Sequence, residues 1–323
     1  MTGIRTICVY VFAGLLVLVS VSGHAEESVS SDVDQHYIFV ETDAHEGPVI
    51  VPDQNRLYFT SVPNFGVDDT NIAIRHVDLE TAQVETFVPD ANMANGMWLS
   101  GDGASLLVAE QGTKDEPAAI SRISLATGER EVIVDSYEDK PFNSPNKVIE
   151  ASTGWIYFSD PDYGYHQGFK NAPQLPMAVY AHNPETGKTT RLTTAVARPH
   201  GLALSLNEDV LFIGDTDAID GSNPYDPSRS QRILSAPLLA PDEIGPLTEV
   251  LSVPVGIPDG FIVTQPHGNL WVAAGDGVRH YSSDGGLIEF FPIKGGAFNV
   301  VHQGNTVFST TDTAIWRTEV DNE

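Results

Sequence analysis

The sequence predicts an all-β protein, a six-bladed β-propeller with an axial metal site. Short runs rich in Val, Ile, Leu, Tyr, Phe and Trp alternate with Gly, Pro, Asn and Asp turns, and no long amphipathic helical pattern follows about residue 36. A two-strand pattern recurs six times, about every 50 residues. A polar residue precedes the second strand of each copy at nearly the same offset.

Each repeat combines an apolar strand, a polar turn and a second strand that is apolar and often aromatic. The six pairs are Val49–Val51 with Leu57–Phe59, Met97–Leu99 with Leu106–Val108, Val148–Ile149 with Ile156–Phe158, Leu202–Leu204 with Leu211–Ile213, Phe261–Val263 with Leu270–Val272, and Val300–Val301 with Val307–Phe308. This period in β-rich sequence fits propeller blades of four strands each. Six blades fill residues 26–323, so we expect a single domain there.

Two stretches are longer than the repeat requires. Residues 165–176 are rich in Gly, Gln, Asn and Pro, and residues 217–230 contain the run Asp-Gly-Ser-Asn-Pro-Tyr-Asp-Pro. We expect both to be long loops over one face of the disc. Loops of this length serve as lids or substrate walls in some proteins and are disordered in others, and the sequence favours neither.

The polar residues that mark the repeats form a predicted ring. They are Glu46, Asn95, Asn146, His200, Asp259 and Asn299. Because equivalent positions in the blades lie at one height around the channel, these side chains are expected to converge at one end of the axis. Carboxylate and amide oxygens suit hard divalent cations such as Ca²⁺ or Mg²⁺. A single Asn-Gly or Asp-Gly pair also fits an ordinary turn, but a turn requires neither Glu nor His.

Composition and missing motifs exclude several classes of function. The chain has 17 Lys and Arg against 44 Asp and Glu, and its net charge of −27 disfavours binding to nucleic acids and anionic membranes. No Gly-x-Ser-x-Gly elbow is present, which gives little support to a serine acyl-enzyme. No Gly-x-Gly-x-x-Gly or P-loop motif is present either, so no nucleotide cofactor is expected.

The N-terminus has the pattern of an export signal. Arg5 precedes a long apolar stretch, and small residues lead to Ala25 before two glutamates. We predict that residues 1–25 are a signal peptide and that the protein is periplasmic or secreted, with no membrane segment after cleavage. The alternative is an uncleaved anchor, for which the apolar stretch is short. The single cysteine, Cys8, lies in this segment, so we expect no cysteine in the mature chain.

Four motifs together resemble the SMP-30/gluconolactonase/luciferin-regenerating-enzyme-like family of six-bladed propellers, over roughly residues 44–318. The motifs are His45-Glu46-Gly47-Pro48-Val49, then Ser144-Pro145-Asn146-Lys147-Val148 with Phe158-Ser159-Asp160-Pro161-Asp162-Tyr163-Gly164, then Arg198-Pro199-His200-Gly201-Leu202, and Pro258-Asp259-Gly260 with Asn269-Leu270-Trp271-Val272-Ala273. The resemblance implies an axial divalent metal, Ca²⁺ by analogy, and hydrolysis of lactones, often sugar-acid lactones. It implies that Glu46 and Asp259 bind the metal, that Asn146 binds metal or substrate, and that Asp259 is the general base.

Two positions depart from the family pattern. Many members have Asn in place of His200, and Asn-Asp in place of Asn146-Lys147. Imidazole binds Zn²⁺ and Mn²⁺ better than Ca²⁺, so the expected cofactor is one divalent cation: Ca²⁺ by resemblance, or Zn²⁺, Mn²⁺ or Mg²⁺. The expected metal ligands are Glu46, Asn146, His200 and Asp259, with Asp259 also catalytic. The expected substrate-binding residues are Asn95, Asn146, Lys147 and Asn299.

The predicted function is an exported metal-dependent hydrolase that opens a small-molecule lactone. An axial cation facing a cleft polarises a carbonyl and positions water, which suits cleavage of a cyclic ester. One alternative is a phosphotriesterase-like hydrolase on the same site. Another is a non-catalytic propeller that binds a ligand and holds a structural metal. The sequence identifies neither the lactone nor the oligomeric state.

Overall fold

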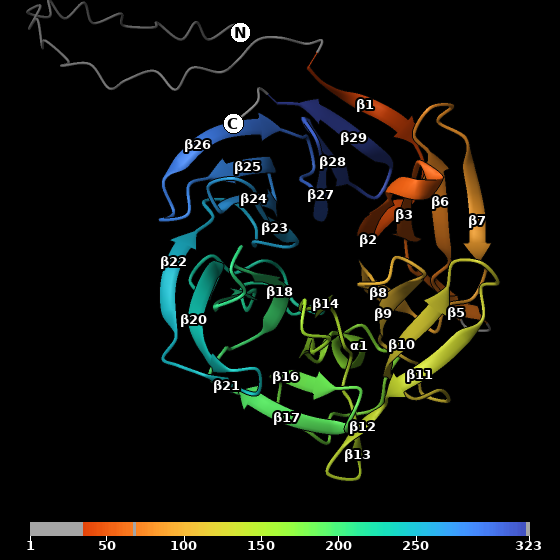
Figure 1. Cartoon of the computed structure of the whole chain (residues 1–323), viewed down its shortest axis with the longest axis vertical. Helices are drawn as coiled ribbons and strands as arrows, with labels where there is room; N and C mark the ends of the chain where they lie inside the picture. Colours follow the sequence, from red (N-terminus) through yellow and green to blue (C-terminus); the bar gives the residue numbers. More distant parts are fainter. Residues whose placement is uncertain (1–34, 67–68, 321–323) are drawn as a thin grey trace, which may run out of the picture. The chain divides into compact units, whose positions relative to one another are not determined.

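The computed structural model describes residues 35–66 and 69–320. In this part of the chain, six antiparallel sheets of four or five strands surround a central axis (Figure 1), and two further sheets have two strands each. The predicted all-β, six-bladed propeller is therefore confirmed. The predicted signal peptide, residues 1–25, lies outside the described residues. Within the described ranges, no helix is long and apolar enough to cross a bilayer.

Each blade begins with the strand that lies nearest the axis (Figure 1). Blade 1 contains β2 (Ala44–Val51), β3 (Arg56–Ser61), β6 (Ile74–Asp78) and β7 (Val84–Val88). Blade 2 contains β8 (Ala94–Leu99), β9 (Ser105–Glu110), β10 (Ala119–Ser124) and β11 (Arg130–Val134). Blade 3 contains β14 (Val148–Glu150), β15 (Ile156–Asp160), β16 (Ala178–Asn183) and β17 (Lys188–Thr193).

The remaining blades follow the same order. Blade 4 contains β18 (Pro199–Leu204), β19 (Val210–Asp215), β20 (Arg232–Ala240) and β22 (Thr248–Ser252), with β21 (Glu243–Ile244) added to β20. Blade 5 contains β23 (Phe261–Thr264), β24 (Asn269–Ala274), β25 (Gly277–Tyr281) and β26 (Leu287–Pro292). Blade 6 contains β27 (Asn299–Gln303), β28 (Thr306–Thr310), β29 (Ala314–Glu319) and β1 (His36–Glu41). The connections include η1 (Pro52–Gln54), β4 (Asn64–Gly66), β5 (Asp69–Asn71), β12 (Ser136–Tyr137), β13 (Lys140–Pro141) and α1 (Tyr163–His166).

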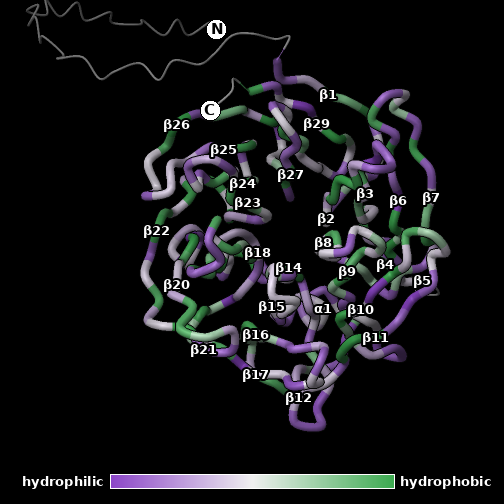
Figure 2. Tube along the Cα trace, viewed as in Figure 1, coloured by the Kyte–Doolittle hydropathy of each residue, from purple (hydrophilic) through white to green (hydrophobic). Residues whose placement is uncertain are grey.

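The six sequence repeats are the first two strands of the six blades. Second strands such as β9 and β24 are buried along their whole length, because a neighbouring blade covers each face. This explains why they have continuous apolar runs rather than alternating ones. Clusters of hydrophobic side chains join adjacent blades: one contains Tyr58 of β3 together with Met97 and Leu106 of blade 2. Figure 2 shows hydrophobic residues in the strands of every blade.

The N-terminal strand β1 closes the ring by completing the last blade. It pairs antiparallel with β29, from His36 opposite Thr318 to Glu41 opposite Ala314. The ring of His36 also stacks on Trp316, with centroids 4.8 Å apart. These contacts join strands from opposite ends of the described chain without a covalent cross-link.

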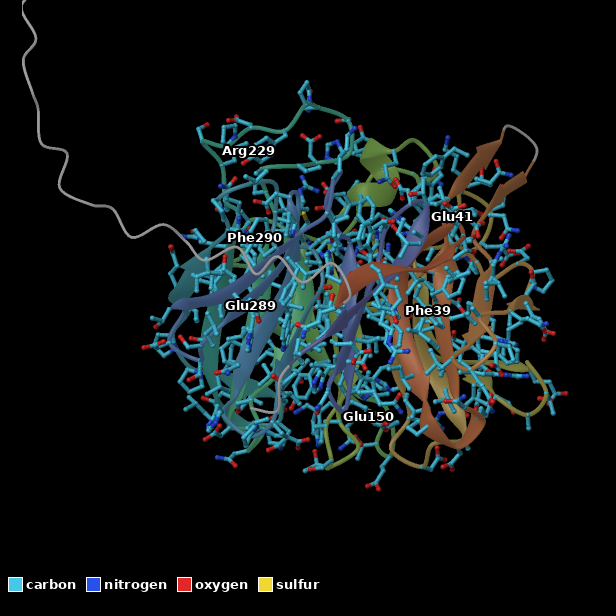
Figure 3. The ribbon with its side chains drawn as sticks, turned by 90° about the horizontal axis from the view of Figure 1, so that it is seen from above. Phe39, Glu41, Glu150, Arg229, Glu289 and Phe290 are labelled. Carbon is cyan, nitrogen blue, oxygen red and sulfur yellow. The ribbon has the colours of Figure 1, made fainter. Side chains whose placement is uncertain are left out.

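The disc has two distinct ends. Figure 3 shows Arg229, in the 217–230 insertion, at one end, and Glu150, the last residue of β14, at the other. The insertion is tied to α1 at the first end, because the hydroxyl of Tyr163 lies 2.8 Å from Thr216 Oγ1 and donates to the carbonyl of Ile219. Ser222 Oγ of this insertion also lies 3.2 Å from His166 Nδ1, so the two insertions meet at that end. We call it the site end.

Candidate metal centre and active site

The predicted ring residues occupy equivalent places in the six blades. Each lies within, or two residues before, the first strand of its blade. At the site end, a cavity of about 290 Å³ is lined by five of them: Glu46, Asn95, Asn146, His200 and Asp259. We call this the axial cavity. The first strands begin there, so one feature of the topology brings together residues more than 200 positions apart.

Glycine follows four of the six ring residues, and close packing between blades explains two of these positions. A Cβ at Gly47, whose φ is +59°, would lie 2.5 Å from the carbonyl oxygen of Asn95 in the next blade. A Cβ at Gly96 would lie 2.5 Å from the carbonyl oxygen of Asn146, to which the Gly96 N–H donates. Any side chain there would push adjacent blades apart. The glycines let consecutive blades touch, which draws the ring residues toward the axis.

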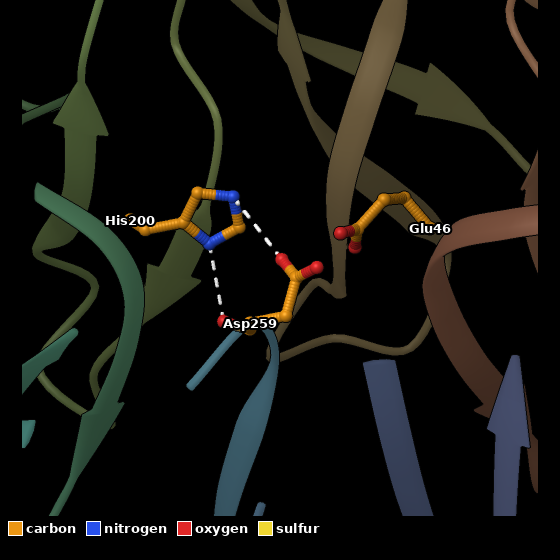
Figure 4. Close-up of side chains that lie close together, drawn as sticks. All are labelled: Glu46, His200 and Asp259. Atoms are coloured by element: carbon orange, nitrogen blue, oxygen red, sulfur yellow. Dashed lines mark hydrogen bonds and ion pairs between the residues drawn. The ribbon is translucent and has the colours of Figure 1, made fainter. Parts of the chain in front are cut away.

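Glu46, His200 and Asp259 form the tightest group in the ring (Figure 4). One potential ligand atom from each lies within 4.8 Å of the others. His200 Nδ1 lies 3.1 Å from the backbone carbonyl of Asp259, which can only accept a hydrogen bond. Nδ1 therefore carries the proton. The other nitrogen, Nε2, lies 3.3 Å from Oδ1 of Asp259.

The cluster of Glu46, His200 and Asp259 is electrostatically unfavourable unless a cation binds in it or Asp259 is protonated. Burial lowers the pKa of His200, so its imidazole is neutral near pH 7 and Nε2 presents a lone pair. Burial raises the pKa of Asp259 well above its ordinary value, and the neighbouring Glu46 carboxylate raises it further. Two lone-pair donors 3.3 Å apart repel each other unless Asp259 is protonated or a cation lies between them.

The surrounding donors fit a divalent cation. Asn95 is 8 % exposed, and its Oδ1 has no hydrogen-bond partner in the described part of the chain. The unpaired Asn95 oxygen, the two carboxylates and the imidazole together form a set of ligands that suits hard or borderline divalent metals. Asn146, 4 % exposed, lines the same cavity. The structure thus brings together all four predicted metal ligands.

Comparison with known proteins shows the family of the chain. Residues 44–299 match the SMP-30/gluconolactonase/LRE-like region. The chain belongs to this family. A gluconolactonase from Zymomonas mobilis is 30% identical over 262 residues, which are 76% of this chain and 70% of that protein.

Further relatives agree with this assignment. The lactonohydrolase oryL of Aspergillus oryzae is 29% identical over 195 residues, 58% of this chain and 44% of that protein. Among solved structures, a gluconolactonase from Xanthomonas campestris superposes with a TM-score of 0.74 at 25% identity, covering 90% of this chain and 96% of that one.

Asn299 does not line the axial cavity but contacts Glu46, which does. Its Nδ2 donates to Glu46 Oε2 at 2.7 Å, and its Oδ1 accepts the N–H of Val300 at 2.8 Å. Glu46 Oε2 also accepts the N–H of Gly47. Both polar atoms of Asn299 are thus engaged, so its position favours orienting Glu46 over the predicted contact with substrate.

Lys147 also lies away from the axial cavity. Its side chain lines a separate cavity at the other end of the channel, whereas that of Asn146 lines the axial one. Consecutive residues of an extended chain point in opposite directions, and the sequence reasoning neglected this alternation. Lys147 is thus not among the residues that line the axial cavity, and its predicted contact with substrate stays a prediction.

Other cavity-lining residues were not among the site residues expected from the sequence. His45 Nδ1 lies 2.7 Å from Oδ1 of Asp312, and its ring packs 4.5 Å from that of Phe298. The ring of Tyr163 meets His200 edge-on at 5.6 Å. The only sequence signal for His45 was its place beside Glu46. Asp312 and Phe298 come from blade 6 and its entry, and nothing local connects them to β2.

A buried carboxylate at the end of the second strand fixes the segment before the ring residue. In blade 3, Asp160 accepts the N–H groups of Asn143 at 3.0 Å and Ser144 at 2.8 Å, just ahead of Asn146. In blade 4, Asp215 accepts the N–H of Arg198 at 3.1 Å, just ahead of His200. These contacts set the approach of the chain to the axis.

Asp160→Asn is expected to lower the free energy of unfolding by about 1–3 kcal/mol, because the amide NH₂ would face one of two backbone N–H donors. Burial raises the pKa of Asp160 to about 7, so the folded state retains its proton at pH values where the unfolded state has lost it. Stability contributed by this group therefore falls as pH rises from about 4 to 7. Urea unfolding across this range tests both effects, and the variant should lack this pH contribution.

Asn299→Leu is expected to weaken divalent-metal binding by about 10- to 100-fold, because Glu46 loses the donor that orients it. The matched control is Asn183→Leu, since Asn183 accepts N–H bonds in a turn after β16. Competition with a fluorescent chelator measures both affinities. Equal metal affinity in the wild type and in Asn299→Leu would show that Asn299 does not support the site.

Proposed function

We propose that the protein is a divalent-metal-dependent hydrolase that opens small-molecule lactones in the axial cavity. The main support for a metal is that two lone-pair donors, His200 Nε2 and Asp259 Oδ1, face each other beside the buried Glu46. The substrate class is supported by the relatives, a gluconolactonase and a lactonohydrolase. The cavity volume of about 290 Å³ suits a ligand smaller than most drug-sized molecules.

In this proposal Glu46, His200 and Asp259 hold the cation. A bound divalent cation polarises an ester carbonyl and lowers the pKa of water. Asp259 is the group that would accept the proton of the attacking water. The amides of Asn95 and Asn146 bind substrate or complete the metal ligands, and Phe298 and Tyr163 form the wall that limits the substrate's size.

We further propose that His200 changes the preferred cation. A ring made only of carboxylate and amide oxygens favours Ca²⁺, whereas a neutral imidazole favours Zn²⁺ or Mn²⁺. The N–H donated by Nδ1 to the Asp259 carbonyl fixes the tautomer that presents Nε2.

The proposed function is tested by a pH-drop assay on a panel of sugar and aliphatic lactones, a simple aryl ester and a dialkyl aryl phosphotriester. Protein stripped with a chelator and reloaded with Zn²⁺, Mn²⁺, Mg²⁺ or Ca²⁺ is compared with the stripped form. We expect lactone opening that disappears on stripping and returns with one or two cations. Turnover of the phosphotriester alone would favour the alternative hydrolase, and tight metal binding without turnover would favour a structural metal.

We also propose that the chain is exported after cleavage behind Ala25. The charge and apolar pattern of residues 1–25 supports this. Intact-mass measurement of the exported protein is expected to give a chain that begins at Glu26. A mass that includes residues 1–25 would indicate a retained anchor.

A further inference from the structure

The end of the channel opposite the site holds a second cavity, of about 260 Å³. It shares no lining residue with the axial cavity. Its walls come from the far parts of the inner strands β2, β8, β23 and β27 and include Met97, Trp98, Ile262 and Val300. Lys147 is the only Lys or Arg that lines it. We call it the distal cavity.

Lys147 is a buried cation without a close partner. Its side chain is only 4 % exposed, and no described residue forms a hydrogen bond or ion pair with its ammonium group. The carboxylate of Glu46 acts on it only at longer range, and that group already accepts hydrogen bonds from Asn299 and Gly47. A charge without a partner is unfavourable to bury, so an anion in the cavity would stabilise the ammonium form of Lys147.

The aliphatic part of the Lys147 side chain packs where Gly96 of blade 2 comes close to the chain of blade 3. Its Cδ lies 3.1 Å from the point that a Cβ at Gly96 would occupy. The side chain is therefore packed against β8, where Met97, Trp98 and Leu99 continue the wall of the distal cavity.

The apolar surface continues beyond the distal cavity. An adjoining hollow of about 430 Å³ shares Trp98, Ile262, Val301 and His302 with it and adds Leu202, Ala203, Leu204, Phe261 and Val263. A charged group on an apolar floor recognises a ligand with one anionic end and an apolar body. At a net charge of −27, the rest of the molecule repels anions, so binding there depends on Lys147.

We propose that the distal cavity binds a small organic monocarboxylate, with its carboxylate against Lys147 and its apolar body between Trp98 and Val300. The size of the cavity, just below the roughly 300 Å³ at which drug-sized sites begin, limits the ligand to a short chain or a single ring. The proposal does not depend on lactone hydrolysis, because the two cavities share no lining residue. The charge of Lys147 nevertheless acts at longer range on Glu46 and His200.

The test is calorimetric titration of the full-length, metal-loaded protein with hexanoate and with its uncharged analogue hexanamide. We expect wild-type protein to bind hexanoate, and Lys147→Met to bind it at least about tenfold more weakly while hexanamide binding is unchanged, since Met retains the apolar stem. Lys140→Met, at an exposed position in β13, is the charge-matched control and should bind like the wild type.

Two further variants locate the site. Val301→Trp, at a half-buried position in the wall, should abolish hexanoate binding by filling the cavity, and it decides the test if Lys147→Met fails to fold. Asp259→Asn should leave hexanoate binding unchanged, because Asp259 lies in the axial cavity. No hexanoate binding by the wild type, equal binding by Lys147→Met, or loss of binding in Asp259→Asn would overturn the proposal.

Discussion

Asp259→Asn is expected to lower lactone turnover by at least about 10²-fold, the effect typical of a lost general acid–base group. The amide keeps the shape of the carboxyl but cannot accept a proton from water. It also removes one of the two carboxylates facing His200, so metal affinity should fall as well. Turnover is therefore measured at saturating metal, with stability followed by thermal unfolding.

Two comparisons make this prediction specific. Asp284→Asn replaces an exposed turn carboxylate that bonds only local groups, and it should keep wild-type turnover. His45→Gln removes a histidine that lines the same cavity and lies beside Asp312, and we expect a smaller loss than for Asp259→Asn. Near-normal turnover of Asp259→Asn at saturating metal, together with a large loss in His45→Gln, would transfer the role of general base to His45.

His200→Asn is expected to change which cation supports activity. The variant replaces Nε2 by an amide oxygen, so preference should move from Zn²⁺ or Mn²⁺ toward Ca²⁺. In the wild type, metal binding requires a neutral imidazole and an ionised Asp259 whose pKa is raised, so metal affinity should fall as pH drops. The variant keeps only the carboxylate contribution and should be less sensitive to acid.

The measurement is activity of both proteins with Zn²⁺, Mn²⁺, Mg²⁺ and Ca²⁺ from pH 5 to 8. His182→Asn is a useful control, because His182 is buried in blade 3 and bonds Thr189 rather than any ring residue. Identical cation ranking and pH profiles for the wild type and His200→Asn would show that His200 is not a ligand. An oxygen-only site would then be the better description.

The blades could be predicted from the sequence because each blade leaves its pattern of apolar and polar residues within a short stretch of the chain. A second strand covered on both faces needs a continuous apolar run, and a ring residue needs a following glycine where the next blade touches it, as at Gly47 and Gly96. The apolar run recurs at each blade and the glycine at four of the six, so the repeat could be recognised without any knowledge of distant contacts. The same regularity brought Glu46, Asn146, His200 and Asp259 together as predicted.

Features that depend on distant contacts were not predictable in this way. The pairing of β1 with β29 closes the ring between segments that share no local pattern. Asp312 orients His45 across more than 260 residues, and only the fold reveals this contact. Lys147 and Asn299 were predicted to bind substrate from their position in the chain, and that stays a prediction. Only the fold reveals that Lys147 lines the opposite cavity and that Asn299 donates a hydrogen bond to Glu46.

The central claim is that Glu46, His200 and Asp259 bind one divalent cation on the propeller axis. The most direct test is the metal content of purified protein, dialysed separately against each of the four cations and measured by mass spectrometry alongside a Glu46→Gln variant. We expect close to one cation per wild-type chain for at least one metal, and a clear loss in the variant. No bound cation in the wild type, or equal content in Glu46→Gln, would contradict the account.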